Sequence, residues 1–194
     1  MGATAVLQTP ENPHRRRWTR EEFVRAADLG LFGPDERLEL VEGEIIEQMP
    51  ENSLHSSGVS AMEEALRAVL PAGCYLRIQS PLALGTYGQP HPDVAVVQGT
   101  WRDYIKNHPT TAALVVEVSD SSLDFDRSAK LRSYARARIY EYWILHLRGE
   151  VLEVHRGPVG DTYAEQIVLR SSDTVAPLFA TDRSIAIADL LPEA

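Results

Sequence analysis

Two short apolar runs, each containing a single carboxylate, constrain the fold of this chain most strongly. Residues 92–97 and 114–119 are rich in valine and are bounded by Pro, Asp or Ser, a pattern typical of buried β-strands. Asp93 lies in the first run and Glu117 in the second. A buried carboxylate is costly in free energy unless it is paired, hydrogen-bonded or bound to a cation. The two acids therefore mark a candidate site, and we expect their carboxylates to converge in one cleft.

The remaining patterns predict a single-domain α/β (α+β) fold, a mixed β-sheet flanked by helices. Residues 1–16 read as a mobile N-terminal tail, and residues 17–194 as one domain, since a chain of 194 residues is long enough for one sizeable core. Thr19, followed by Glu21 and Glu22, is typical of a helix start. Helical spacing of apolar residues predicts further helices over residues 54–70 and 124–138. Strands are predicted over residues 37–41, 44–49, 74–79, 82–86, 92–97, 113–118, 141–146, 151–155 and 163–169, with a turn at Gly43.

Composition narrows the class of protein. A hydrophobic fraction of 44% and a charged fraction of 24% are those of a globular protein. The single cysteine, Cys74, excludes an internal disulfide framework and a cysteine-based zinc cluster, which favours the cytoplasm. No secretory leader, membrane span or glycine-rich nucleotide-binding loop is evident, so we expect no membrane partner and no nucleotide cofactor. A net charge of −9 does not point to nucleic acid, although local basic patches matter more than the total.

A series of motifs carries a family resemblance. In chain order they are Leu38-Glu39-Leu40-Val41-Glu42-Gly43-Glu44, His55, Pro92-Asp93, Val116-Glu117-Val118-Ser119, Asp126…Lys130…Tyr134 and Glu141-Tyr142-Trp143-Ile144. Together they resemble the Uma-two family, restriction-endonuclease-like proteins of the PD-(D/E)XK nuclease superfamily. The resemblance runs from about Trp18 to the end of the chain and implies a restriction-endonuclease-like mixed sheet.

The resemblance also implies an active site. Asp93 and Glu117 would hold Mg²⁺, or Mn²⁺ in its place, with the carbonyl of Val118 as a further ligand. Ser119 stands where the superfamily usually has a lysine, and the resemblance places that lysine at Lys130, on the following helix. Glu39 would be a fourth catalytic residue, contributed by the N-terminal segment. The implied activity is a Mg²⁺-dependent DNA endonuclease that hydrolyses phosphodiester bonds and works as a homodimer.

Three accessory residues complete the expected site. His55 opens a helix and could carry a proton or contact metal-bound water. It could equally bind a neighbouring loop. Arg127 and Arg132 are expected to contact DNA, with Arg127, Lys130 and Tyr134 on one stripe of the helix.

Each assignment has a purely structural alternative. Asp93 follows a proline and could cap a turn, and Glu117 could form a buried ion pair with Lys130 or Arg132. Lys130 could lie on a solvated helix face. Glu39 alternates with Leu38 and Leu40 and could face solvent, while Tyr134, Tyr142 and Trp143 read as core aromatics.

The alternative function is a non-catalytic nucleic-acid- or protein-binding module that keeps the nuclease fold. The acidic net charge and the displaced lysine favour this module. Retention of Asp93, Glu117 and Lys130 together favours the enzyme, because a scaffold without activity has no need of buried acids.

Overall fold

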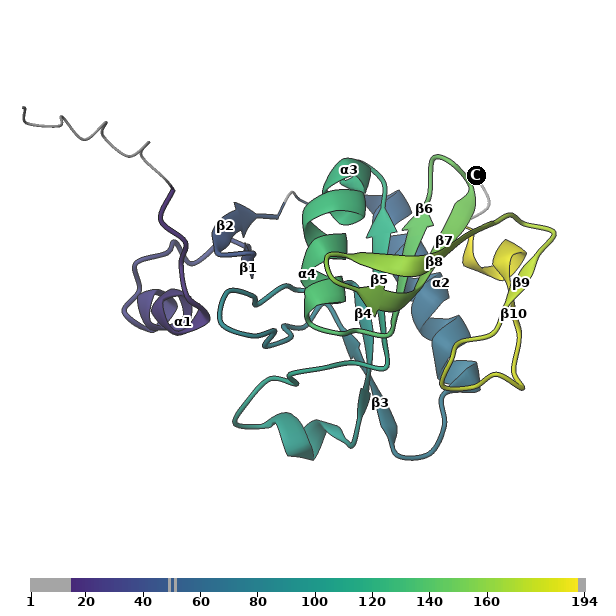
Figure 1. The fold of residues 1–194 in the computed structure, drawn as a ribbon, viewed down its shortest axis with the longest axis horizontal. Coiled ribbons are helices and arrows are strands. Elements are labelled where there is room, and N and C mark those ends of the chain that lie inside the picture. The colour runs from purple at the N-terminus through teal and green to yellow at the C-terminus, as the bar shows by residue number, and fades with distance from the viewer. Residues whose placement is uncertain (1–14, 49, 51, 192–194) are drawn as a thin grey trace, which may run out of the picture.

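A computed structural model of the protein describes residues 15–48, 50 and 52–191 (Figure 1). The tail predicted for residues 1–16 lies outside the described residues, apart from Arg15 and Arg16. In chain order the elements are α1 (Arg20–Asp28), β1 (Leu38–Val41), β2 (Glu44–Glu47), α2 (Ser53–Val69), β3 (Cys74–Ile78), β4 (Val94–Gln98), η1 (Trp101–Tyr104), β5 (Leu114–Ser119), α3 (Leu123–Phe125), η2 (Asp126–Lys130), α4 (Leu131–Arg136), β6 (Glu141–His146), β7 (Val151–Val159), β8 (Thr162–Leu169), β9 (Thr174–Val175), β10 (Ile185–Ala186) and η3 (Ile187–Leu190). Within the described ranges, no helix has both the length and the apolar character that a bilayer crossing needs.

A six-stranded mixed sheet forms the centre of the described structure. Its strand order is β3-β4-β5-β6-β7-β8. β5 and β6 are parallel, and the other neighbours are antiparallel. The parallel pair needs a crossover, which α3, η2 and α4 supply. This architecture confirms the predicted mixed sheet flanked by helices.

The two faces of the sheet bury separate apolar clusters, because side chains alternate along a strand. Val116 and Val118 of β5 pack under α2, together with Val59 and Met62. Val115 of the same strand faces the opposite side, where α4 packs. In Figure 1, α2 and α4 lie on opposite sides of the sheet. Glu117, two residues after Val115, therefore belongs to the α4 face.

The predicted N-terminal helix and hairpin are both present. Thr19 caps α1 in a capping box with Glu22, as the sequence indicates. β1 and β2 form a separate two-stranded sheet, with Leu40 opposite Ile45. The backbone of Leu40 also exchanges hydrogen bonds with that of Gln89 (2.7 and 3.2 Å), and this contact fixes the hairpin beside the main sheet.

Two sequence predictions are wrong in detail. Residues 82–86 form an irregular loop and not a strand, because their amides bond to carbonyls of other loop residues, as Leu82 does to Pro90. The helix predicted over residues 124–138 begins at Leu123, ends at Arg136 and contains the π-helical turn η2. A π turn widens the helix locally, and such turns are frequent at functional sites.

Gly58 allows α2 to approach β5 closely. A Cβ atom at this position would lie 2.9 Å from Cγ1 of Val118 and 3.0 Å from Cδ2 of Leu147. Both distances are shorter than ordinary van der Waals contacts, so an alanine would push α2 away from the strand that carries Glu117.

We therefore expect Gly58→Ala to lower the free energy of unfolding by about 1–2 kcal/mol, although alanine is favoured by about 1 kcal/mol in a free helix. Urea unfolding monitored by circular dichroism measures this change. Ser57→Ala is the matched control, since Ser57 is exposed on the same helix and its replacement should stabilise slightly. Equal stabilisation by both substitutions would contradict the close approach.

Candidate functional site

The candidate site is a cavity of about 650 Å³ between the β1–β2 hairpin and the main sheet. Its walls come from the hairpin, the N-terminal end of α2, the loop before β4, the end of β5, and η2. Six residues expected from the sequence line it: Glu39, His55, Asp93, Glu117, Val118 and Lys130. Residues up to 94 positions apart in the chain, Glu36 and Lys130, thus line one pocket.

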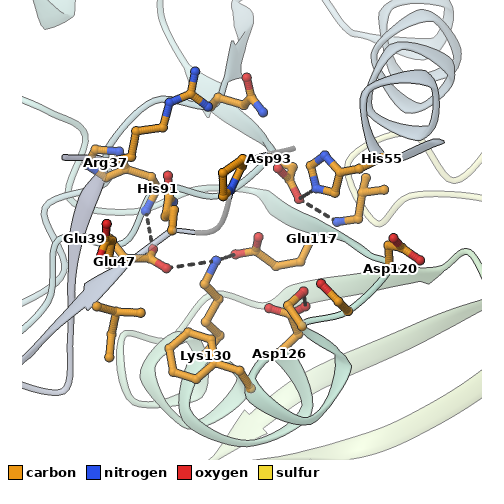
Figure 2. Close-up of a pocket in the computed structure, with 18 of the residues that line it drawn as sticks. Arg37, Glu39, Glu47, His55, His91, Asp93, Glu117, Asp120, Asp126 and Lys130 are labelled. Atoms are coloured by element: carbon orange, nitrogen blue, oxygen red, sulfur yellow. Dashed lines mark hydrogen bonds and ion pairs between the residues drawn. The ribbon is translucent and has the colours of Figure 1, made fainter. Parts of the chain in front are cut away.

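Lys130 lies at the centre of this constellation. Its side chain is only 7% exposed, and its Nζ atom is 3.0 Å from Oε1 of Glu117 and 3.4 Å from Oε1 of Glu39. Figure 2 shows the lysine rising from η2 and ending between these two carboxylates. Lys130 is therefore not on a solvated helix face, and Glu39, itself 2% exposed, is not a solvent-facing strand residue.

Asp93 faces the same cavity from the other side of Glu117 (Figure 2). Its Oδ2 atom accepts a hydrogen bond from the backbone N–H of Val118 (2.7 Å). Nε2 of His55 lies 3.4 Å from the same oxygen. Asn52 caps α2 by accepting a hydrogen bond from the His55 amide (2.9 Å) and so fixes the start of the helix that presents His55.

Burial and the repulsion between neighbouring carboxylates favour the protonated forms of two acids in the cavity, Glu117 and Asp126. Burial raises the pKa of Glu117 well above its usual 4.5, and the nearby negative charges of Asp93, Asp126 and Glu39 add to the rise, while Lys130 opposes it. Burial also raises the pKa of Asp126. For Lys130, burial acts to lower the pKa, but the surrounding carboxylates outweigh it and raise the pKa. One ammonium thus faces an excess of acids.

Three residues of the site were not assigned to it from the sequence. His91 donates its backbone N–H to Oε2 of Glu39 (2.9 Å), and burial lowers the pKa of its imidazole. Asp126 lines the cavity and accepts a hydrogen bond from the Ser122 hydroxyl (2.6 Å). The hydroxyl of Tyr134 donates to Oε1 of Glu117 (2.5 Å).

The positions of these three residues in the sequence could have assigned them to the site. His91 directly precedes Pro92-Asp93, and Asp126 and Tyr134 lie four residues before and after Lys130, a spacing that places side chains on one helix face. Tyr134 is a core aromatic, as predicted, but its hydroxyl also reaches the site.

The structure places Arg127 and Arg132 outside the cavity. Arg127 binds both carboxylate oxygens of Glu153, and Arg132 binds Glu42 (3.0 Å). The expected stripe of Arg127, Lys130 and Tyr134 is therefore not formed, since the wide η2 turn rotates Arg127 away from the Lys130 side. Contact of Arg127 and Arg132 with DNA stays a prediction.

No group of three or more His, Cys, Asp or Glu side chains within the described ranges is arranged as a metal cluster. Any cation in this cavity would therefore be held by few protein ligands. Magnesium is commonly bound in this way, through one or two carboxylates, with water and substrate phosphate as the other ligands. Val118, the third expected ligand, lines the cavity beside Asp93 and Glu117.

Comparisons with known proteins identify a family and a fold. Residues 20–188 match the Uma2 family, which is described as "Putative restriction endonuclease". Among solved structures, the chain is similar to the crystal structure of a putative nuclease belonging to DUF820 from Anabaena variabilis ATCC 29413. The TM-score is 0.68 at 19% sequence identity, over 89% of this chain and 96% of the other, so this likeness concerns the fold. No curated protein matches the chain.

The raised pKa of Glu117 predicts a pH dependence of stability. A carboxyl whose pKa is higher in the folded than in the unfolded state stabilises the fold fully below the unfolded value, here near 4.5, and loses that contribution as the pH rises through the folded value. In EDTA, the urea midpoint of the wild type should therefore fall as the pH is raised above 4.5. Glu117→Gln cannot ionise and should show a smaller fall, the remainder being due to Asp126. Parallel curves for the two proteins would contradict the assignment.

Proposed function

The chain belongs to the Uma2 family, and from this we propose that it is a Mg²⁺-dependent DNA endonuclease that hydrolyses phosphodiester bonds in the cavity around Lys130. The observation that carries the proposal is the Lys130 ammonium, which lies within 3.4 Å of Glu39 and Glu117 in a cavity that Asp93 also lines. If Lys130 and Glu117 formed an ion pair for stability alone, they would not need Glu39 and Asp93 beside them. Mn²⁺ is expected to substitute for Mg²⁺.

The donor set fits a hard divalent cation. Within the described residues, Oε2 of Glu117 and Oδ1 of Asp93 accept no hydrogen bond, whereas the other oxygen of each carboxylate does. Each acid can therefore offer one oxygen to a cation while the protein holds the other. Val118 also lines the cavity, and its carbonyl is the proposed further ligand.

The charge of the cavity also supports a cation. Its lining includes seven acidic residues against two basic ones, Arg37 and Lys130. The acids are Glu36, Glu39, Glu47, Asp93, Glu117, Asp120 and Asp126. A phosphodiester approaching this surface alone would be repelled, so a divalent cation is needed to make phosphate binding favourable.

The protein groups have distinct roles in this proposal. A bound divalent cation supplies Lewis-acid charge, which lowers the pKa of water and stabilises the transferring phosphoryl oxygens. Lys130 places a second positive charge on the phosphate, and Glu39 holds the ammonium from the hairpin side. His55 orients Asp93 through the 3.4 Å contact and is placed to exchange a proton with nearby water.

Duplex cleavage favours a homodimer. One chain provides one such site, and two antiparallel DNA strands are related by a two-fold axis, so a two-fold pair of chains would cut both strands. A monomer would instead leave nicked products, and the ratio of nicked to linear plasmid distinguishes the two.

We expect the wild type to nick supercoiled plasmid with Mg²⁺ or Mn²⁺ and to lose this activity in EDTA. Asp93→Asn should lower the rate at least ~100-fold, since the cation contributes several kcal/mol to transition-state stabilisation. Asp161→Asn is the control, because Asp161 is exposed and pairs with Arg136 at the surface. Cleavage that persists in EDTA or in Asp93→Asn would overturn the proposal. DNA binding without cleavage would support the non-catalytic module.

The catalytic role of Lys130 can be tested against a matched control, since the chain has only two lysines, Lys106 and Lys130. Lys106 is exposed, whereas Lys130 is buried. Lys130→Met should abolish single-turnover cleavage, because the variant lacks the ammonium that acts on the phosphate. Lys106→Met should cut like the wild type. Wild-type cleavage by Lys130→Met would remove the lysine from the mechanism.

A further inference from the structure

A buried tyrosine hydroxyl shares its acceptor with Lys130. Tyr134 is fully buried, and its hydroxyl donates to Oε1 of Glu117 at 2.5 Å. The ammonium of Lys130 contacts the same oxygen at 3.0 Å. Two donors therefore converge on one oxygen of the carboxylate, both from the helical segment that covers this face of the sheet.

These two donors fix the orientation of the Glu117 carboxylate. Rotation of the carboxylate would break both contacts at Oε1, and a buried donor left without a partner is costly. With Oε1 held toward η2 and α4, Oε2 is the oxygen left for the cavity, where no described residue donates to it. Lys130 also contacts Glu39, so the tyrosine is the donor that serves Glu117 alone.

We propose that Tyr134 is a positioning residue that orients Glu117, so that its Oε2 atom is presented to a divalent cation in the cavity. This inference rests on the proposed function. Partners that hydrogen-bond to metal ligands set their orientation and commonly affect affinity by one to two orders of magnitude. Tyr134 would act in this way from the core side of the sheet, without touching the cation or the substrate.

Packing alone does not require the hydroxyl of Tyr134. Its ring packs on Tyr142, with the ring centroids 4.9 Å apart, in the apolar cluster under α4. A phenylalanine would fill the same space. Tyr163 belongs to the same cluster, and its buried hydroxyl has no hydrogen-bond partner among the described residues. Within this cluster, Tyr134 and Tyr163 therefore form a matched pair, since the hydroxyl of Tyr134 reaches Glu117 and that of Tyr163 has no described partner.

This pair provides the matched experiment. Tyr134→Phe and Tyr163→Phe each remove one buried hydroxyl from the same cluster. Mn²⁺ alone is titrated into each protein by calorimetry, and urea unfolding in EDTA measures stability separately. We expect Tyr134→Phe to raise the Kd for Mn²⁺ about 10-fold, and Tyr163→Phe to leave it unchanged.

The possible results separate the inference from the proposed function. An unchanged Kd in Tyr134→Phe would overturn the inference and leave the proposed function standing, because the wild type would still bind Mn²⁺. Absence of Mn²⁺ binding by the wild type would overturn both. If Tyr134→Phe does not fold, the wild type is titrated with Mg²⁺ and followed by NMR. The ring Cζ signal of Tyr134 should then shift while that of Tyr163 does not, and a static Tyr134 signal would overturn the inference.

Discussion

The burial of one ammonium among several carboxylates is the interaction on which the described site depends. Lys130 from η2 joins Glu117 of β5 to Glu39 of the hairpin, three segments that no local interaction would bring together. A charge removed from water is tolerated only with opposite charge and hydrogen bonds beside it. Because each of the three groups needs the others, the hairpin, the sheet and the crossover helix are held in one arrangement.

The same interaction leaves the cavity with an excess of negative charge. Lys130 cannot neutralise Glu117, Glu39, Asp126 and Asp93 together. Burial, with a smaller contribution from the neighbouring negative charges, raises the pKa values of Glu117 and Asp126. Protons or a divalent cation can relieve the excess of negative charge. The negative net charge of the chain weighs against nucleic-acid binding. Inside the cavity, however, the same excess of carboxylates is a reason to expect that a phosphate binds together with a cation.

The π-helical turn η2 determines which charged side chains of the crossover helix reach the cavity. The π turn Asp126–Lys130 presents both of its terminal side chains to the cavity, while Arg127 turns away to Glu153. An α-helix drawn from the sequence places Arg127, Lys130 and Tyr134 on one stripe, and two of these three reach Glu117. A local change in helical width is set by packing against the sheet, so residue spacing does not reveal it.

The sequence by itself determined the mixed sheet, its flanking helices and the placing of single acids in apolar strands, because alternation and helical spacing are local properties of the chain. It also identified Asp93, Glu117 and Lys130 as one set through their motifs. Only the tertiary structure decided that Glu39 is buried, that residues 82–86 form a loop, and that Tyr134 serves the site as well as the core. The burial of Glu39 and the role of Tyr134 depend on contacts between residues 91 and 17 positions apart, Lys130 with Glu39 and Tyr134 with Glu117. Alternation along a strand or spacing along a helix says nothing about such pairs.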